Sequence, residues 1–130
     1  FMTDYPHDLP SRWFDEEVRK HFGIDVLGEP FDTAVGYKRY RRGNLRLMVV
    51  RMENLDNAAD AVADFLELSQ PLIIGRENSA RDKSYSSEYA QALATFDLSD
   101  EYLSRCYESQ FAEHFYSTDE LEAFRNRWRR

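Results

Sequence analysis

The sequence predicts a mixed α/β fold: a small sheet that contains a β-hairpin, several helices packed against it, and a helical C-terminal half. Two patterns lead to this prediction. Apolar and aromatic residues between positions 37 and 52 surround the turn signal Arg42-Gly43-Asn44, and most apolar residues after position 84 recur at helical spacing. The chain has 130 residues, 42% hydrophobic and 15% aromatic. We therefore expect one domain over residues 1–130, with a core of large side chains.

The N-terminal part is predicted to be a loop followed by a helix. Residues 1–10 contain two prolines and little periodicity, which is typical of a lead-in loop. Ser11 is an N-cap candidate for a helix over residues 11–21, and Gly23 is a suitable stop. Apolar side chains recur at helical spacing in this segment, at Trp13, Phe14, Val18 and Phe22.

The hairpin is predicted from strands at 37–41 and 45–52. The second strand contains the consecutive apolar run Leu-Met-Val-Val, which is typical of a strand covered on both faces, so we expect it to be central in the sheet. A helix over 58–66 should follow, because its apolar residues recur every three or four positions. A short strand is expected at 71–74. Residues 11–75 would thus form a helix, a hairpin and a second helix.

Residues 76–130 are predicted to form a polar loop and a helical cap. A helix is expected over 85–96, and Ser99 is placed to cap the next one. The string from Ser117 to Glu120 is a capping box, which marks the clearest helix start in the chain. Helical spacing favours core positions, rather than an aromatic stacking platform, for Tyr85, Tyr89, Tyr107, Phe111 and Phe115.

Charge and cysteine content exclude several classes of function. The formal net charge is −7, which argues against general attraction to nucleic acid. The single cysteine, Cys106, has no His or Cys cluster beside it, so no metal site is predicted and a reducing, cytoplasmic location fits best. No apolar run is long enough to span a bilayer, and no signal peptide is recognisable. The opening residues, Phe1 and Met2, are consistent with a start inside a longer protein.

Few polar residues stand out as candidates for chemistry. His114 is a candidate general base, although a histidine beside aromatic residues is more often packed or capping. Arg51 lies where the second strand ends, which is where α/β proteins place ligand groups; an ion pair with Glu53 is the alternative. Asn78 and Lys83 lie in a polar loop before a helix, a suitable position for an anion, with plain solvation as the alternative.

Two further features limit the predictions for binding. The five glycines, at positions 23, 28, 36, 43 and 75, are too far apart to form a phosphate-binding loop. Basic residues cluster in the hairpin, at Lys38, Arg39, Arg41 and Arg42, where a solvated turn is favoured over a ligand site.

Several strings, taken in order, resemble the family of capsular polysaccharide synthesis proteins, which is similar to sulfotransferases. The strings extend over nearly the whole chain and are Trp13-Phe14-Asp15-Glu16-Glu17, Gly23-Ile24-Asp25-Val26, Gly36-Tyr37, Val49-Val50-Arg51-Met52-Glu53-Asn54-Leu55, Phe65-Leu66, His114-Phe115-Tyr116-Ser117, Phe124 and Trp128.

The resemblance implies a C-terminal portion of a sulfotransferase-like domain. The full-length enzyme would move a sulfuryl group from 3′-phosphoadenylyl sulfate to a sugar hydroxyl of a capsular or cell-surface polysaccharide. Arg51, Asn78 and Lys83 are then expected to contact the donor. The upstream loops that hold the donor phosphates have no equivalent in this chain, and Met52 replaces a common tyrosine. We therefore expect no tight donor binding. The alternative is a noncatalytic interaction module or remnant that pairs with an N-terminal half or a second protein chain.

Overall fold

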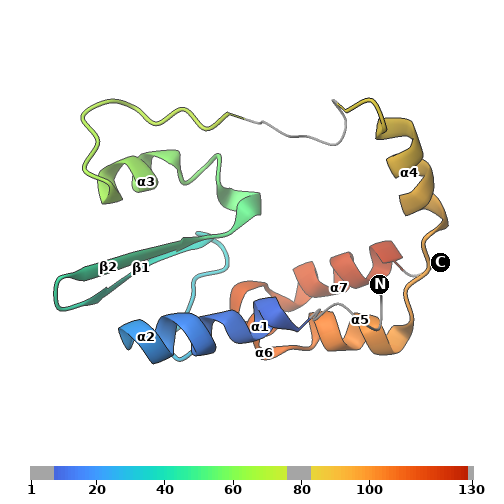
Figure 1. Ribbon diagram of the computed structural model, residues 1–130, viewed down its shortest axis with the longest axis horizontal. Coiled ribbons are helices and arrows are strands. Elements are labelled where there is room, and N and C mark those ends of the chain that lie inside the picture. The colour runs from blue at the N-terminus through green and yellow to red at the C-terminus, as the bar shows by residue number, and fades with distance from the viewer. Residues whose placement is uncertain (1–7, 76–82, 129–130) are drawn as a thin grey trace.

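The computed structural model describes residues 8–75 and 83–128, which form a mixed fold of one two-stranded antiparallel sheet and several helices (Figure 1). This confirms the predicted mixed class. In chain order the elements are α1 (Leu9–Trp13), a π-helical segment (Phe14–Arg19), α2 (Lys20–Phe22), β1 (Tyr37–Arg42), β2 (Leu45–Val50), a 3-10 turn (Met52–Asn54), α3 (Ala59–Phe65), α4 (Ser86–Thr95), α5 (Asp100–Tyr107), α6 (Gln110–Phe115) and α7 (Thr118–Trp128).

The first helical stretch is continuous from Leu9 to Phe22, which confirms the predicted helix with a slightly earlier start. Pro10 lies in its first turn, where the missing amide hydrogen is no loss. Gly23 ends the helix in a left-handed conformation with φ 65°, which glycine adopts without steric cost.

The hairpin is confirmed. Its strands pair in register from Tyr37 opposite Val50 to Arg42 opposite Leu45, so that Gly43 and Asn44 form a two-residue turn. Gly43 has φ 58°, as this turn class requires.

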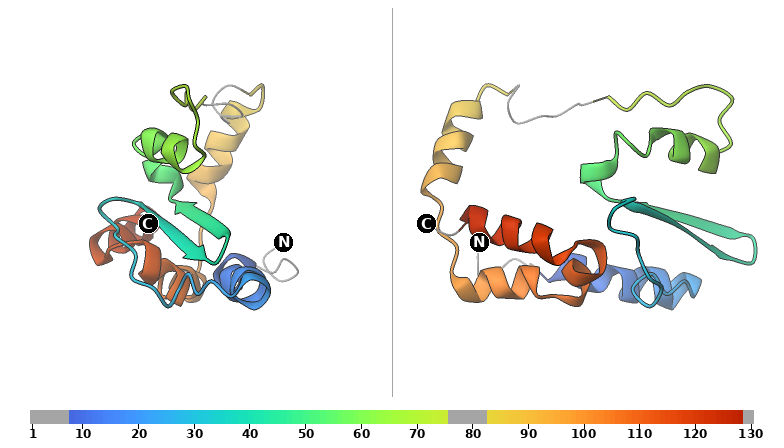
Figure 2. Two further views of the ribbon diagram at one scale, coloured as in Figure 1. Left: turned by 90° about the vertical axis from the view of Figure 1, so that its left-hand side faces the viewer. Right: turned by 180° about the vertical axis from the view of Figure 1, so that it is seen from behind.

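Two strand predictions are wrong. Within the described residues β2 pairs only with β1, so it is not a central strand. Residues 71–74 are not assigned to a strand, and Ile73 is 90% exposed. The apolar run in β2 has another cause: Leu47 and Val49 pack on the core, whereas Met48 alternates to the face on which α3 lies (Figures 1 and 2).

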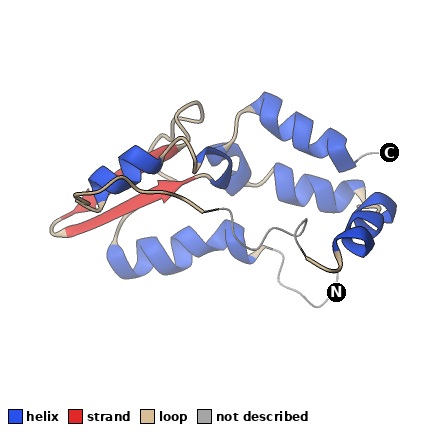
Figure 3. Cartoon of the chain, turned by 90° about the horizontal axis from the view of Figure 1, so that it is seen from above, coloured by secondary structure: helices blue, strands red, loops and turns tan. Residues whose placement is uncertain are grey.

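The core joins the N-terminal helix, the following loop, one face of the hairpin and α6. Figure 3 shows the helices and the hairpin from above. Its buried members are Val18, Ile24, Val26, Leu27, Tyr40 and Phe115. Partly buried aromatic rings extend this cluster; Phe115 lies 5.4 Å from Phe14 and 4.9 Å from Phe31, centroid to centroid. The predicted core position of Phe115 is thus confirmed.

The C-terminal helices begin at serine caps. Ser99 accepts a hydrogen bond from the Tyr102 amide at 3.2 Å, and Ser109 caps α6 in the same way through Ala112.

Helix α4 lies apart from the hairpin, as Figure 1 shows. The prediction that its aromatic stripe is core is wrong: Tyr85 and Tyr89 are 54% and 48% exposed.

None of the helices in the described segments has the length and apolar character needed to cross a membrane.

Candidate functional site

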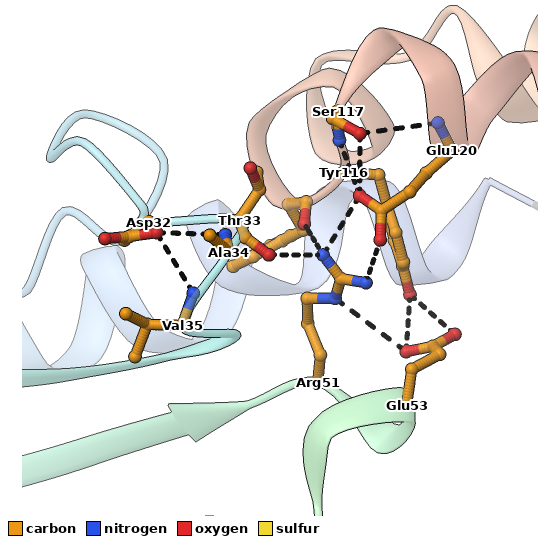
Figure 4. Close-up of polar contacts among 10 residues, drawn as sticks. Asp32, Thr33, Ala34, Val35, Arg51, Glu53, Tyr116, Ser117 and Glu120 are labelled. Atoms are coloured by element: carbon orange, nitrogen blue, oxygen red, sulfur yellow. Dashed lines mark hydrogen bonds and ion pairs between the residues drawn. The ribbon is translucent and has the colours of Figure 1, made fainter. Parts of the chain in front are cut away.

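The end of β2 places Arg51 at the centre of a polar cluster (Figure 4). Its backbone amide donates to the Gly36 carbonyl at 2.9 Å, and its side chain is only 5% exposed. The Nη1 group donates to the carbonyls of Thr33 and Phe115, both at 3.1 Å. The guanidinium therefore joins the loop before β1 to the end of α6, where a cation also suits the helix dipole.

Glu120 neutralises this buried cation. Nη1 donates to Glu120 Oε2 at 3.2 Å, and Nη2 donates to Oε1. The hydrogen bond from Arg51 holds the pKa of Glu120 at about 2, well below its usual value. Burial disfavours the charged guanidinium, but the hydrogen bond and charge of Glu120 outweigh it and raise the pKa of Arg51. The pair thus stays ionised at any ordinary pH.

The capping box of α7 orients the Glu120 carboxylate. The Ser117 amide and hydroxyl donate to Glu120 Oε2, at 2.8 and 3.0 Å, and the Glu120 amide donates to Ser117 Oγ at 3.3 Å. The same carboxylate therefore serves as a helix cap and as the counter-ion of Arg51. This confirms the predicted capping box.

Tyr116 and Glu53 form the solvent side of the cluster. The Arg51 guanidinium carbon lies 4.5 Å from the centroid of the Tyr116 ring, a cation–π contact. The Tyr116 hydroxyl lies 3.3 Å from both oxygens of the Glu53 carboxylate, to which it donates. Arg51 Nε is buried without a hydrogen bond in the described structure, and its ion-pair contact with Glu53 is long, at 3.9 Å. Glu53 is 46% exposed, so it is the accessible acceptor of the site.

A pocket of about 380 Å³ adjoins this carboxylate. Aromatic rings from the segment of α5 to α7 line it together with Glu53 and Arg127, so one acidic and one basic group lie in a mostly apolar pocket. This volume lies within the usual range for small-molecule sites. The rings are those of Tyr107, Phe111, Tyr116, Phe124 and Trp128.

His114, the predicted base, has different neighbours. Its ring packs 4.7 Å from that of Phe115 and 6.1 Å from that of Phe31, and its Nε2 atom is buried without a described partner. Burial lowers the pKa of His114, and the positive charge of Lys38 lowers it further. These contacts favour the packed-residue alternative.

Of the three predicted donor contacts, the structure describes two. Arg51 is engaged by Glu120, and Lys83 lies just before α4, a helix that Figures 1 and 2 show apart from the end of β2. Asn78 lies outside the described residues. No three His, Cys, Asp or Glu side chains converge as metal ligands in segments 8–75 and 83–128.

Sequence reasoning missed the role of two residues. Tyr116 was expected only as part of a family string, and Glu120 only as a capping residue. Glu120 is 69 positions from Arg51, and no local pattern reveals such a pair. The Arg51-x-Glu53 spacing was the available signal for Glu53.

Comparison with known proteins identifies the family to which the chain belongs. The model of the family described as "Putative capsular polysaccharide synthesis protein" (NKWYS) matches residues 2–117. The match includes Arg51, Glu53 and Tyr116, and Glu120 lies beyond its end. No curated protein and no solved structure matches the chain. Because the matched region is most of the 130 residues, the chain belongs to this family, whose name indicates involvement in capsular polysaccharide synthesis.

Proposed function

We propose that the protein transfers a sulfuryl group from 3′-phosphoadenylyl sulfate to a sugar hydroxyl of a capsular or cell-surface polysaccharide, and that this chain supplies the sugar side of the site. One observation carries the proposal: an accessible carboxylate, Glu53, faces a pocket lined by aromatic rings in a member of a capsular polysaccharide family. Carboxylates accept hydrogen bonds from sugar hydroxyls, and ring faces suit their apolar C–H groups. The free thiol of Cys106 is consistent with a cytoplasmic site of action.

Each residue of the cluster has a part in this reaction. The sugar oxygen attacks sulfur while the bond from sulfur to the donor phosphate oxygen breaks, and 3′-phosphoadenosine 5′-phosphate leaves with the electron pair. The hydroxyl proton passes to Glu53, which Tyr116 orients through its hydroxyl. Arg51 is a positioning residue, because its guanidinium supports the Tyr116 ring and is already neutralised by Glu120. Asn78 and Lys83 stay as proposed contacts to the donor, whose main phosphate contacts would come from outside this chain.

The test measures sulfate in the polysaccharide. A strain lacking the gene is complemented with the natural protein, with Glu53→Gln, or with Glu17→Gln, an exposed carboxylate on the first helical stretch. We expect the Glu53 variant to reduce polysaccharide sulfate at least 100-fold, as loss of a general base does, and the Glu17 variant to restore it. Full sulfation with Glu53→Gln would contradict the assignment.

A noncatalytic interaction module is the second candidate, because the aromatic side of α4 is exposed. Tyr89, Leu93 and Phe96 line an almost wholly apolar groove of about 330 Å³ together with Trp128, a surface suited to a second protein chain. The interaction module is supported, and the transferase contradicted, by one set of results: the Phe96→Ser variant fails in polysaccharide synthesis, the Glu53→Gln variant does not, and no sulfuryl transfer is detected.

A further inference from the structure

The face of the hairpin opposite the core carries a second polar pocket. Side chains alternate across each strand, so Arg39, Arg41 and Arg46 all point toward α3, away from the core residues Tyr40 and Leu47. Together with α3 they enclose a pocket of about 430 Å³. Its lining consists of Arg39, Tyr40, Arg41, Arg46, Asp64, Phe65 and Glu67.

This pocket has an excess of positive charge. Arg39 Nη2 lies 2.9 Å from Asp64 Oδ2, and Arg46 Nη1 lies 2.8 Å from Glu67 Oε1. Arg41 is the third cation; its Nε donates to the Gly43 carbonyl at 3.1 Å. Three guanidinium groups therefore face two carboxylates, in a chain whose net charge is −7. The pocket is therefore electrostatically complementary to an anionic ligand.

The existing ion pairs are exchangeable. The Arg39 and Asp64 side chains are 44% and 73% exposed, and those of Arg46 and Glu67 are 47% and 73% exposed. Exposed pairs of this kind contribute little to stability, because solvent screens them. The carboxylate of a ligand can therefore take the place of Asp64 or Glu67 beside a guanidinium, leaving the displaced carboxylate to accept from ligand hydroxyls.

Glu67 is held in this position against its backbone preference. It is the residue after the C-cap of α3 and adopts φ 56°. The amides of Leu68 and Glu67 donate to the Ala63 and Asp64 carbonyls, at 2.9 and 3.0 Å, the pattern in which glycine is usual. The left-handed conformation is strained for a residue that carries a side chain, as glutamate does. The strained residue presents its carboxylate to Arg46, and strain of this kind often marks a functional position.

An apolar surface completes the pocket. The Arg46 guanidinium lies 5.3 Å from the Phe65 ring centroid, and the ring is partly exposed. Planar guanidinium groups bind carboxylates in a two-point geometry. Aspartate and glutamate accept from hydroxyls, and an aromatic edge contacts C–H groups. This combination fits a ligand that carries a carboxylate, several hydroxyls and apolar ring faces.

We propose that the pocket between the hairpin and α3 binds a carboxylate-bearing sugar unit, such as a uronate residue of an acidic polysaccharide. The sugar carboxylate pairs with Arg41 and Arg46, and its hydroxyls donate to Asp64 and Glu67. This site lies on the opposite face of the hairpin from the core. It takes its sugar chemistry from the proposed function but requires no sulfuryl transfer.

The test is a nuclear magnetic resonance titration of the ¹⁵N-labelled 130-residue chain. The probes are a glucuronate-containing tetrasaccharide, the same tetrasaccharide with its carboxyls reduced to alcohols, and inorganic phosphate. We expect shifts in hairpin and α3 amides with the acidic tetrasaccharide, and binding at least tenfold weaker for the reduced form. Arg41→Gln should raise the dissociation constant about tenfold. The matched control is Arg42→Gln on the opposite face of the same strand, which should leave the constant within twofold.

Five results would overturn the proposal. They are no detectable binding of the acidic tetrasaccharide, equal binding of acidic and reduced tetrasaccharides, equal or tighter binding of phosphate than of the acidic tetrasaccharide, shifts confined to other surfaces, and equal loss in the Arg41 and Arg42 variants. Because the titration on the natural chain maps the site by itself, a variant that fails to fold does not prevent the decision. If the titration shows no binding but sulfation depends on Glu53, only the proposal for this pocket is contradicted. If the pocket binds the acidic tetrasaccharide but no sulfation is detected, only the proposed reaction is contradicted.

Discussion

The Arg51 side chain joins the loop before β1, the end of β2, the end of α6 and the start of α7. Burying its charge is costly unless the partner groups surround it. Here two carbonyls, one carboxylate and one aromatic ring do so. The position of Glu53 beside its pocket therefore depends on residues that do not contact the pocket.

Removing the counter-ion should destabilise the chain. Glu120→Gln leaves the Arg51 guanidinium buried without its charge partner, and we expect a loss of about 2 kcal/mol, less than for a fully buried pair because Glu120 is 34% exposed. Chemical denaturation measures this. Glu122→Gln, an exposed change on the same helix, should alter the free energy of unfolding by less than about 0.5 kcal/mol.

The same pair predicts a dependence of stability on pH. The pKa of Glu120 is about 2 in the folded chain and 4.5 for an unperturbed glutamate. A lowered pKa stabilises the fold fully above the unfolded value, and this contribution disappears as pH falls through the folded value. Between about pH 4.5 and 2 the natural chain should therefore lose more stability than Glu120→Gln. Parallel denaturation curves across this window would contradict the assignment.

His114 predicts a second pH effect, which comes from a base that the fold keeps neutral rather than from an acid that it keeps ionised. Burial lowers its pKa below the unperturbed 6.5, so the unfolded chain takes up a proton first as pH falls. The neutral, packed imidazole therefore stabilises the fold above about pH 6.5, and this contribution decreases below it. A histidine titration by nuclear magnetic resonance should give His114 a pKa below the unperturbed 6.5. A higher value for His114 would rule out the packed assignment.

At the scale of elements, α7 depends on its first turn. Ser117→Ala removes the hydroxyl that accepts from the Glu120 amide and that donates to its carboxylate. We expect a loss of roughly 1 kcal/mol in the free energy of unfolding. Ser87→Ala provides the comparison, because that exposed hydroxyl donates to the neighbouring Glu88 carboxylate and caps no helix start. Equal effects of the two changes would mean that the cap contributes nothing.

The hairpin should tolerate a charge at one position of its core face and not at another. Leu47 packs against the core cluster, whereas Leu45 on the same face is 38% exposed beside the turn. Leu47→Asp should cost about 2–3 kcal/mol, since a charge enters a partly buried apolar site. Leu45→Asp should cost less than about 0.5 kcal/mol. The thermal midpoints of the two variants give the comparison, and similar midpoints would contradict this packing.

At the scale of the whole molecule, three sets of cations in the described part of the chain lie at separate places. Arg51 holds the centre of the fold, the hairpin arginines face α3, and Lys83 lies beside α4. Phosphate groups are bound best where several donors converge at one point, as in a glycine-rich loop at a helix start. The glycine spacing of this sequence does not provide such a loop.

We therefore predict weak binding of 3′-phosphoadenosine 5′-phosphate to the 130-residue chain, with a dissociation constant no better than roughly 1 mM. Isolated polar contacts seldom outweigh the entropy lost on association. Calorimetric titration checks this. Micromolar binding that Lys83→Ala abolishes would instead establish an anion site in the loop before α4.

Local patterns in the sequence determined the elements whose causes are local: the hairpin turn at Gly43, the helix stop at Gly23, and the caps at Ser99 and Ser117. They failed where the cause is tertiary. The apolar run in β2 indicated a central strand, yet in the described residues β2 pairs only with β1, and α3 lies over the face opposite the core. The aromatic stripe of α4 indicated a core helix, yet it is exposed. Spacing alone cannot reveal what packs against a face.

For the candidate site the division is similar. The sequence identified Arg51 and its possible pairing with Glu53, because a polar string after an apolar strand is a local signal. Only the tertiary structure brought Glu120 and Tyr116 to that string, across 69 and 63 positions, and set three hairpin arginines opposite α3. Long-range ion pairs depend on how whole elements pack, and the packing is decided by the combined burial of many side chains rather than by any one segment.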